Sequence, residues 1–317
     1  MYNLPKTQKT MKRIFAAAAV LLLSALVAFA QDFNAAVDAF NAGAKAQETD
    51  KAEALTQFRA ALAIVQTLED PEAAALAAKC KDAIAKTLLS SAKEDVNNAK
   101  YDEALAALAQ TQAVAAEYGA AEVGTEAASL VPNVYMRKGS TLLKEKDFAG
   151  AAEALAKVTE LTPDNGQAFL LLGQAKLQAG SADEAIAALE KAHELEVPQA
   201  AKLLSTTYLK QGAALLKEGK NAQAIEALEK SNSYQESANA YKLIANAYTK
   251  SGKSAQAIEN YKKYLEVNPG AKDAPDILFT IAATAQKSGD KATAKEYYKK
   301  LAGTKYAAQA EAQLKVL

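Results

Sequence analysis

Apolar and small residues recur with helical spacing between Gly166 and Gln199, and a turn at Gly180-Ser181 divides this stretch in two. The first part places four residues at i, i+3, i+4 and i+7: Phe169, Leu172, Gly173 and Lys176. The second part places three at i, i+4 and i+7: Ala185, Leu189 and Ala192. A single hairpin of two such helices cannot bury its apolar faces, because each helix has only one partner surface. The pattern therefore predicts a stack of helical hairpins.

The same pattern recurs in register along the chain. A small mid-unit residue returns at intervals of 34, 39, 33 and 37 residues, at Ala151, Ala185, Ala224, Ala257 and Ala294. A large residue follows each by four positions, at Leu155, Leu189, Leu228, Tyr261 and Tyr298. A small residue precedes each by twelve, at Gly139, Gly173, Gly212, Ala245 and Ala282. Glycine inside a helix costs about 1 kcal/mol relative to alanine. We therefore expect these small residues to allow close approach of the paired helices.

This pattern resembles the tetratricopeptide repeat, a 34-residue helix-turn-helix unit with residue preferences at fixed places. The matching residues are Phe169, Leu172-Gly173, Ala185, Leu189, Ala192 and Pro198. Pro198 stands one position late, and Lys176 replaces the usual aromatic residue. The resemblance covers residues 132–301 well and 33–117 loosely. It implies an all-α, right-handed solenoid of about seven hairpins.

Four segments follow from this reading of the chain. Residues 1–30 are predicted to be a signal peptide, 31–118 degenerate N-terminal repeats, 125–303 the repeat array, and 304–317 a closing helix. The first hairpin is suggested by Phe40, Gly43, Ala54 and Phe58. The N-terminal segment is either a set of capping repeats, which are commonly atypical, or a helical region that only resembles the array.

The first 30 residues have the pattern of an export signal. Lys6, Lys9, Lys12 and Arg13 precede an apolar run that ends at Ala28-Phe29-Ala30, which predicts cleavage before Gln31. Met11 is an alternative start to Met1. An uncleaved membrane anchor is the other reading, but the apolar run of 17 residues is at the lower limit for spanning a bilayer. The expected location is periplasmic or secreted, with no membrane span after cleavage.

Charge and composition argue against a nucleic-acid partner. The chain holds 37 Lys and Arg and 37 Asp and Glu, and without the four basic residues of the signal its net charge is −4. Nucleic-acid binding usually requires a basic stripe, and none stands out in the sequence. Abundant alanine with few Gly and Pro fits an all-α array.

Residues for catalysis or metal binding are not apparent. His193 is the only histidine and Cys80 the only cysteine, so neither a tetrahedral zinc site nor an internal disulfide is expected. Free cysteine is most often buried, which is the role expected for Cys80. Ser251-Gly252-Lys253-Ser254 lacks the first glycine and the preceding strand of a P-loop. We expect neither an enzyme nor a cofactor.

In the family that this chain resembles, the first helices line a groove that holds a peptide. Carried over position by position, the expected groove residues are Leu170, Gln174, Leu177, Leu209, Leu216, Lys242, Asn246, Lys250 and Phe279. The four leucines form an expected apolar centre, and the two lysines with Asn246 an adjoining polar and basic section. The alternative is that the leucines pack against neighbouring repeats and that the lysines are solvated.

Lys242 and Asn246 also match two residues of the carboxylate clamp by which some family members hold a peptide C-terminus. A further clamp asparagine is replaced by Thr280. The resemblance implies a non-catalytic scaffold that binds a protein or peptide partner at the cell envelope. An accessory subunit of an envelope enzyme or secretion complex, a carbohydrate or peptidoglycan binder, and self-association through terminal helices are the alternatives.

Overall fold

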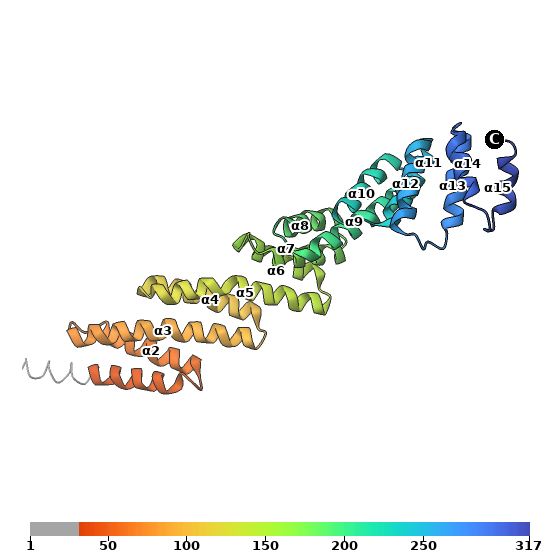
Figure 1. Cartoon of the computed structure of the whole chain (residues 1–317). Coiled ribbons are helices and arrows are strands. Elements are labelled where there is room, and N and C mark those ends of the chain that lie inside the picture. Colours follow the sequence, from red (N-terminus) through yellow and green to blue (C-terminus); the bar gives the residue numbers. More distant parts are fainter. Residues whose placement is uncertain (1–31) are drawn as a thin grey trace, which may run out of the picture. The chain divides into compact units, whose positions relative to one another are not determined.

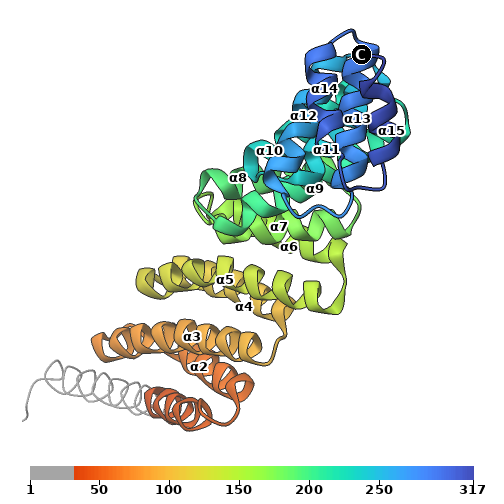
Figure 2. The same cartoon turned by 45° about the vertical axis from the view of Figure 1, so that its right-hand side comes forward.

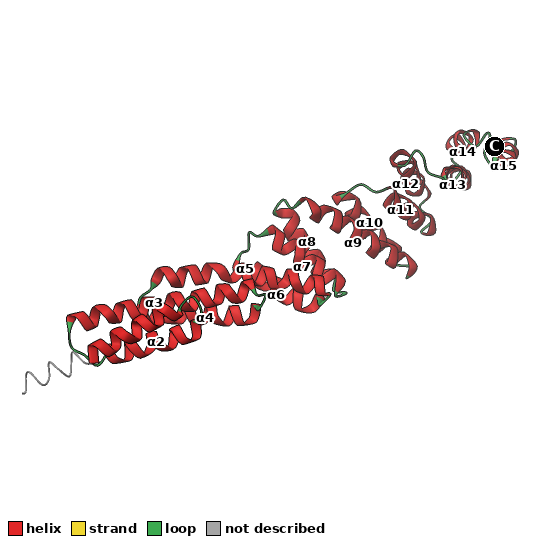
Figure 3. Ribbon diagram, turned by 90° about the horizontal axis from the view of Figure 1, so that it is seen from below, coloured by secondary structure: helices red, strands yellow, loops and turns green. Residues whose placement is uncertain are grey.

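The structure is a computed structural model, and it describes residues 32–317. The predicted signal peptide and its cleavage site lie outside the described residues. Residues 32–317 contain helices and loops and no strand, as Figure 3 shows. The chain divides into two units, of which the first ends at Thr141 and the second runs from Leu142 to Leu317. The expected all-α fold is confirmed.

The first unit contains long helices in sequence order (Figure 1). They are the helical residues 32–46, α2 (Lys51–Val65), α3 (Pro71–Asn97), α4 (Tyr101–Tyr118) and most of α5 (Ala121–Glu145). In this unit α2 packs against α3 and α3 against α4. Buried residues of α4 and α5 belong to one core cluster. Cys80 is buried in the core of this unit, as expected, and burial raises the pKa of its thiol to about 11. The thiol is therefore protonated at neutral pH.

The second unit is a regular succession of helices. They are α6 (Phe148–Leu161), α7 (Gly166–Gln178), α8 (Ala182–Glu194), α9 (Pro198–Lys217), α10 (Asn221–Tyr234), α11 (Ala238–Lys250), α12 (Ser254–Val267), α13 (Ala274–Lys287), α14 (Lys291–Lys299) and α15 (Ala307–Leu314). From α6 to α15 each helix packs against its successor (Figure 2). In the hairpins α7–α8, α9–α10, α11–α12 and α13–α14, we call the earlier helix the first helix and the later one the second helix.

The aligned small residues lie at the helix crossings. The five mid-unit alanines 151, 185, 224, 257 and 294 are all fully buried. A Cβ atom built on Gly173 would stand 2.6 Å from Cγ of Leu189, and one on Gly212 would stand 2.5 Å from Cγ of Leu228. At these two crossings there is therefore no room for a side chain on the first helix, which confirms the expected close approach there.

The turns within hairpins share one hydrogen-bond pattern. At the end of α7, Ser181 N–H donates to Lys176 O at 2.9 Å, and at the end of α11, Lys253 N–H donates to Tyr248 O at 2.9 Å. This Schellman-type closure needs a left-handed residue in between, and Gly180 has φ 85°. Side chains also cap the N-termini of several helices. At the start of α6, for example, the Asp147 carboxylate accepts a hydrogen bond from Gly150 N–H at 2.9 Å.

A candidate functional site on the first helices

Two of the four leucines expected at the apolar centre of the groove are core residues. Leu170 is 3% exposed and belongs to a cluster with Ala200 and Leu204 of α9, and Leu216 is 8% exposed. Leu177 and Leu209 are half-buried. Leu177 packs against the core cluster that contains Leu170, and Leu209 packs against the one that contains Leu216. The expectation of an open leucine is therefore wrong for Leu170 and Leu216, whose side chains are buried, whereas Leu177 and Leu209 keep part of their surface exposed.

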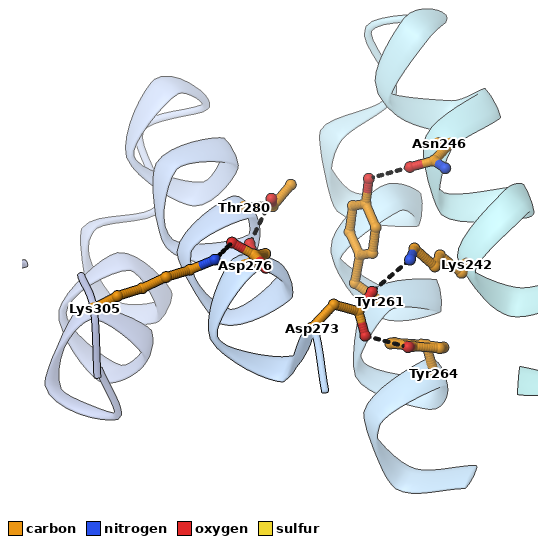
Figure 4. A network of polar contacts seen from close by, with 8 residues as sticks. All are labelled: Lys242, Asn246, Tyr261, Tyr264, Asp273, Asp276, Thr280 and Lys305. Carbon is orange, nitrogen blue, oxygen red and sulfur yellow. Dashed lines mark hydrogen bonds and ion pairs between the residues drawn. The ribbon is translucent and has the colours of Figure 1, made fainter. Parts of the chain in front are cut away.

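Lys242 and Asn246 are held by partners within the chain, as Figure 4 shows. The Lys242 ammonium forms an ion pair with Asp273 at the start of α13, and the hydroxyl of Tyr264 donates to the same carboxylate at 2.5 Å. Lys242 and then Tyr264 lower the pKa of Asp273, and the hydrogen bond to Asp273 raises the pKa of Lys242. The cation that a carboxylate clamp would use is thus already neutralised.

Asn246 is fixed by a hydrogen bond across its own hairpin. The Tyr261 hydroxyl donates to Asn246 Oδ1 at 2.7 Å, from the second helix α12 to the first helix α11 (Figure 4). Thr280, which stands where the clamp would have another asparagine, donates its hydroxyl to Asp276 O of its own helix at 2.8 Å. These contacts account for both clamp matches by internal packing and leave the clamp without support.

Phe279 is covered by the C-terminal segment. The Tyr306 ring stacks on it with a centroid separation of 4.7 Å and an interplanar angle of 21°. The Tyr298 ring approaches its edge at 6.0 Å. The Tyr306 hydroxyl donates to Asp276 at 2.5 Å, and Gln286 donates to Gln313 of α15 at 2.8 Å. The expected groove position on α13 is therefore in contact with the chain's own closing segment.

Three of the expected residues meet at one open hollow between α9 and α11. It has a volume of about 420 Å³ and is lined by Ala213, Leu216, Lys217, Leu243, Asn246, Thr249, Lys250 and Tyr261. We call it the α9–α11 hollow. Gln174 and Leu177 lie on α7 and do not line it. The carried-over positions missed Leu243, and they missed Tyr261 because it comes from a second helix.

A larger hollow of about 500 Å³ lies between α8, α9 and α10, on the side of the second helices. The hollow is lined by one aromatic side chain, Tyr208, whose hydroxyl donates a hydrogen bond to Glu190 at 2.9 Å. Burial of this hydroxyl, and then its hydrogen bond to the Glu190 carboxylate, raise the pKa of Tyr208. One ring face stacks on Tyr234 at 6.0 Å, and the Lys230 ammonium lies 5.5 Å from the ring centroid. Because its own neighbours occupy the ring, Tyr208 offers no free platform for a sugar.

The comparisons with known proteins agree with the repeats seen in the fold. Tetratricopeptide-repeat profiles match residues 136–201, 238–270 and 275–305. The chain therefore contains tetratricopeptide repeats in these three ranges. Such repeats form protein-interaction scaffolds and generally carry no catalytic activity. No curated protein matches the chain significantly.

Solved structures of similar proteins include MamA, at 26% identity and a TM-score of 0.36, covering 57% of this chain and 96% of that one. A MamA fragment from Desulfovibrio magneticus RS-1 is 19% identical with a TM-score of 0.32, covering 54% and 92%. PilF of Pseudomonas aeruginosa is 19% identical with a TM-score of 0.29, covering 54% and 75%. At TM-scores this low, these likenesses carry no argument about function.

Among residues 32–317, no helix has the length and apolar character needed to cross a membrane.

Proposed function

We propose that this protein is a non-catalytic interaction scaffold of the cell envelope that binds a segment of a partner protein on its first helices. The α9–α11 hollow is the centre of the proposed binding surface. The observation that carries the proposal is the meeting of Leu216, Asn246 and Lys250 at one open hollow. These three residues come from repeat positions that bind peptides in the family.

The dimensions of the hollow fit part of a chain better than a whole small molecule. Its volume of about 420 Å³ is near the lower end of the range for ligand pockets, and it is open on the side of the first helices. A partner segment would place one or two side chains in it and extend along α9 and α11. This arrangement would also suit an accessory subunit of a larger envelope complex.

The envelope location rests on the first 30 residues, with their basic start, apolar run and Ala28-Phe29-Ala30 ending. Cell fractionation followed by N-terminal sequencing of the purified protein tests it. A mature chain that begins at Gln31 in the periplasmic or extracellular fraction is the expected result. An intact N-terminus in the cytoplasmic fraction would refute the location.

The binding surface is tested by filling the hollow. Thr249 is exposed at its rim, so Thr249→Trp should plug it without disturbing the core. Ala222→Trp on the exposed side of α10 is the matched control, because it adds the same ring outside the hollow. Partners captured from envelope extract by the parent and by Ala222→Trp should be lost with Thr249→Trp. Identical partners for all three proteins would place the binding surface elsewhere.

A further inference from the structure

We infer that the α9–α11 hollow takes a peptide segment in which an apolar side chain is flanked by acidic residues. This inference rests on the proposed function and specifies the chemistry of the partner. It concerns side-chain carboxylates within a segment and does not require a free peptide C-terminus. Three features of the hollow carry it: its floor, the charge of its rim, and one fixed hydrogen-bond donor.

The floor of the hollow is apolar. Leu216 and Leu243 line it from two successive first helices, and Ala213 and the mostly buried Tyr261 ring line it as well. Burial of one Leu, Met or Phe side chain from a partner would remove apolar surface of both molecules from water. The floor therefore favours a peptide with an apolar anchor over a purely polar or phosphate-rich ligand.

The rim of the hollow is basic and unneutralised. Lys217 and Lys250 stand at the same place in the last turns of α9 and α11, and both are exposed. Within the part of the chain that the structure describes, neither has a carboxylate at ion-pairing distance. The pairing of Lys242 with Asp273 and of Lys176 with Glu184 shows the contrast. Two free ammonium groups beside an apolar floor complement carboxylates on either side of an apolar anchor.

A lysine in the last turn of a helix also interacts favourably with the helix dipole, which accounts for single lysines at helix ends. That interaction leaves the ammonium group in solvent and able to pair with a second anion. The dipole explains the presence of Lys217 and Lys250, whereas their position at the edge of one apolar hollow is what gives the hollow its charge.

Asn246 supplies a donor with a fixed direction. Its Oδ1 accepts the Tyr261 hydroxyl, so its Nδ2 lies on the other side of the amide (Figure 4). Among the hydrogen bonds of residues 32–317, none uses this Nδ2 group. An extended peptide presents backbone carbonyls that can accept from it. The side chain that matched a clamp thus acts here as a donor to the main chain of the partner.

The experiment uses the purified protein and a displayed library of random peptides about twelve residues long, joined to their carrier through the C-terminus. Enriched peptides are synthesised with both ends blocked, and their Kd is measured against the parent and three variants. Lys217→Glu/Lys250→Glu reverses the rim charge. Lys144→Glu/Lys287→Glu reverses the same repeat position on α5 and α13 as the matched control. Thr249→Trp plugs the hollow.

We expect enriched peptides to carry Asp or Glu within a few residues of Leu, Met or Phe. Reversal of Lys217 and Lys250 should raise Kd about tenfold or more, and the effect should fall with added salt, since two exposed pairs contribute modestly and are screened. The control pair should change Kd less than about twofold. Thr249→Trp should abolish binding.

Each contrary result has a distinct meaning. Neutral or basic peptides that Thr249→Trp blocks would overturn the acidic chemistry and leave the proposed function standing. Peptides that bind Thr249→Trp as well as the parent, or no enrichment at all, would overturn both. A random DNA oligonucleotide that displaces the peptides and depends on Lys217 and Lys250 more strongly than they do would assign the rim to nucleic acid instead.

Discussion

The hairpin of α3 and α4 in the first unit and the hairpin of α9 and α10 in the second follow one packing rule with different helix lengths. Ala104 and Leu108 are fully buried in α4, as are Ala224 and Leu228 in α10. However, α3 has 27 residues and α9 has 20. The crossing between the paired helices is thus kept while the helices around it vary in length.

The turns of these two hairpins differ in sequence and agree in geometry. Ala99 has φ 58° after α3, and Gly219 has φ 77° after α9. Lys100 N–H donates to Asp95 O at 2.8 Å, and Lys220 N–H donates to Leu215 O at 2.9 Å, which is the same closure. A left-handed alanine is less favourable than a left-handed glycine. The comparison indicates that the crossing is essential to the hairpin and that the turn residue only adjusts its stability.

Truncation of the residue at the crossing should have the largest effect in both hairpins. Leu108→Ala and Leu228→Ala should each lower the free energy of unfolding by about 2–5 kcal/mol, because a fully buried leucine leaves a cavity. Urea denaturation followed by circular dichroism measures this loss. Leu161→Ala, at a half-exposed leucine, is the control and should cost far less. A small effect at Leu108 alone would break the comparison and show a loosely packed N-terminal hairpin.

Enlarging the small residue at the crossing should have the next largest effect. Ala104→Leu and Ala257→Leu should each cost about 1–3 kcal/mol by overpacking a contact that has no free space. Thermal melts compare them with Ala222→Leu on the exposed side of α10. Unchanged melting temperatures for the two buried variants would contradict the close crossing.

Exchange of the turn residues should have a smaller effect, of opposite sign in the two hairpins. Gly219→Ala should destabilise by about 1 kcal/mol, because alanine is strained at positive φ. Ala99→Gly should stabilise by about 0.5 kcal/mol, since relief of that strain exceeds the added entropy of the unfolded chain. Gly270→Ala, with open space around the new Cβ, serves as the control. The measurement is the midpoint of urea unfolding, and shifts of the same sign would refute the assignment.

The smallest effect is expected from pH. The pKa of Asp273 is lowered by Lys242, so this group stabilises the fold at neutral pH, and that contribution is lost as pH falls below about 4. Asp273→Asn should therefore reduce the loss of stability between neutral and acidic pH, by less than about 1 kcal/mol because both partners are partly exposed. Asp102→Asn, at a largely exposed carboxylate of the first unit, is the control. An unaltered pH profile for Asp273→Asn would mean that the pair contributes nothing.

The repeat register was predictable from the sequence because it depends on local rules. The mid-unit alanines, the glycines at crossings and the glycines in turns are each required by packing within one hairpin. The open surface was less predictable because it depends on the next hairpin. Position in the repeat alone did not reveal that α9 covers Leu170, that Asp273 pairs with Lys242 from 31 residues away, or that Tyr306 covers Phe279.

The hydrogen bond from Tyr261 to Asn246 makes a buried residue of α12 responsible for the direction of a polar group on α11. Replacing that tyrosine by phenylalanine would free the amide to rotate and to present its oxygen outward. Two relatives with identical side chains along their first helices could then prefer different ligands. Their selectivity would be decided by a hydroxyl on a second helix.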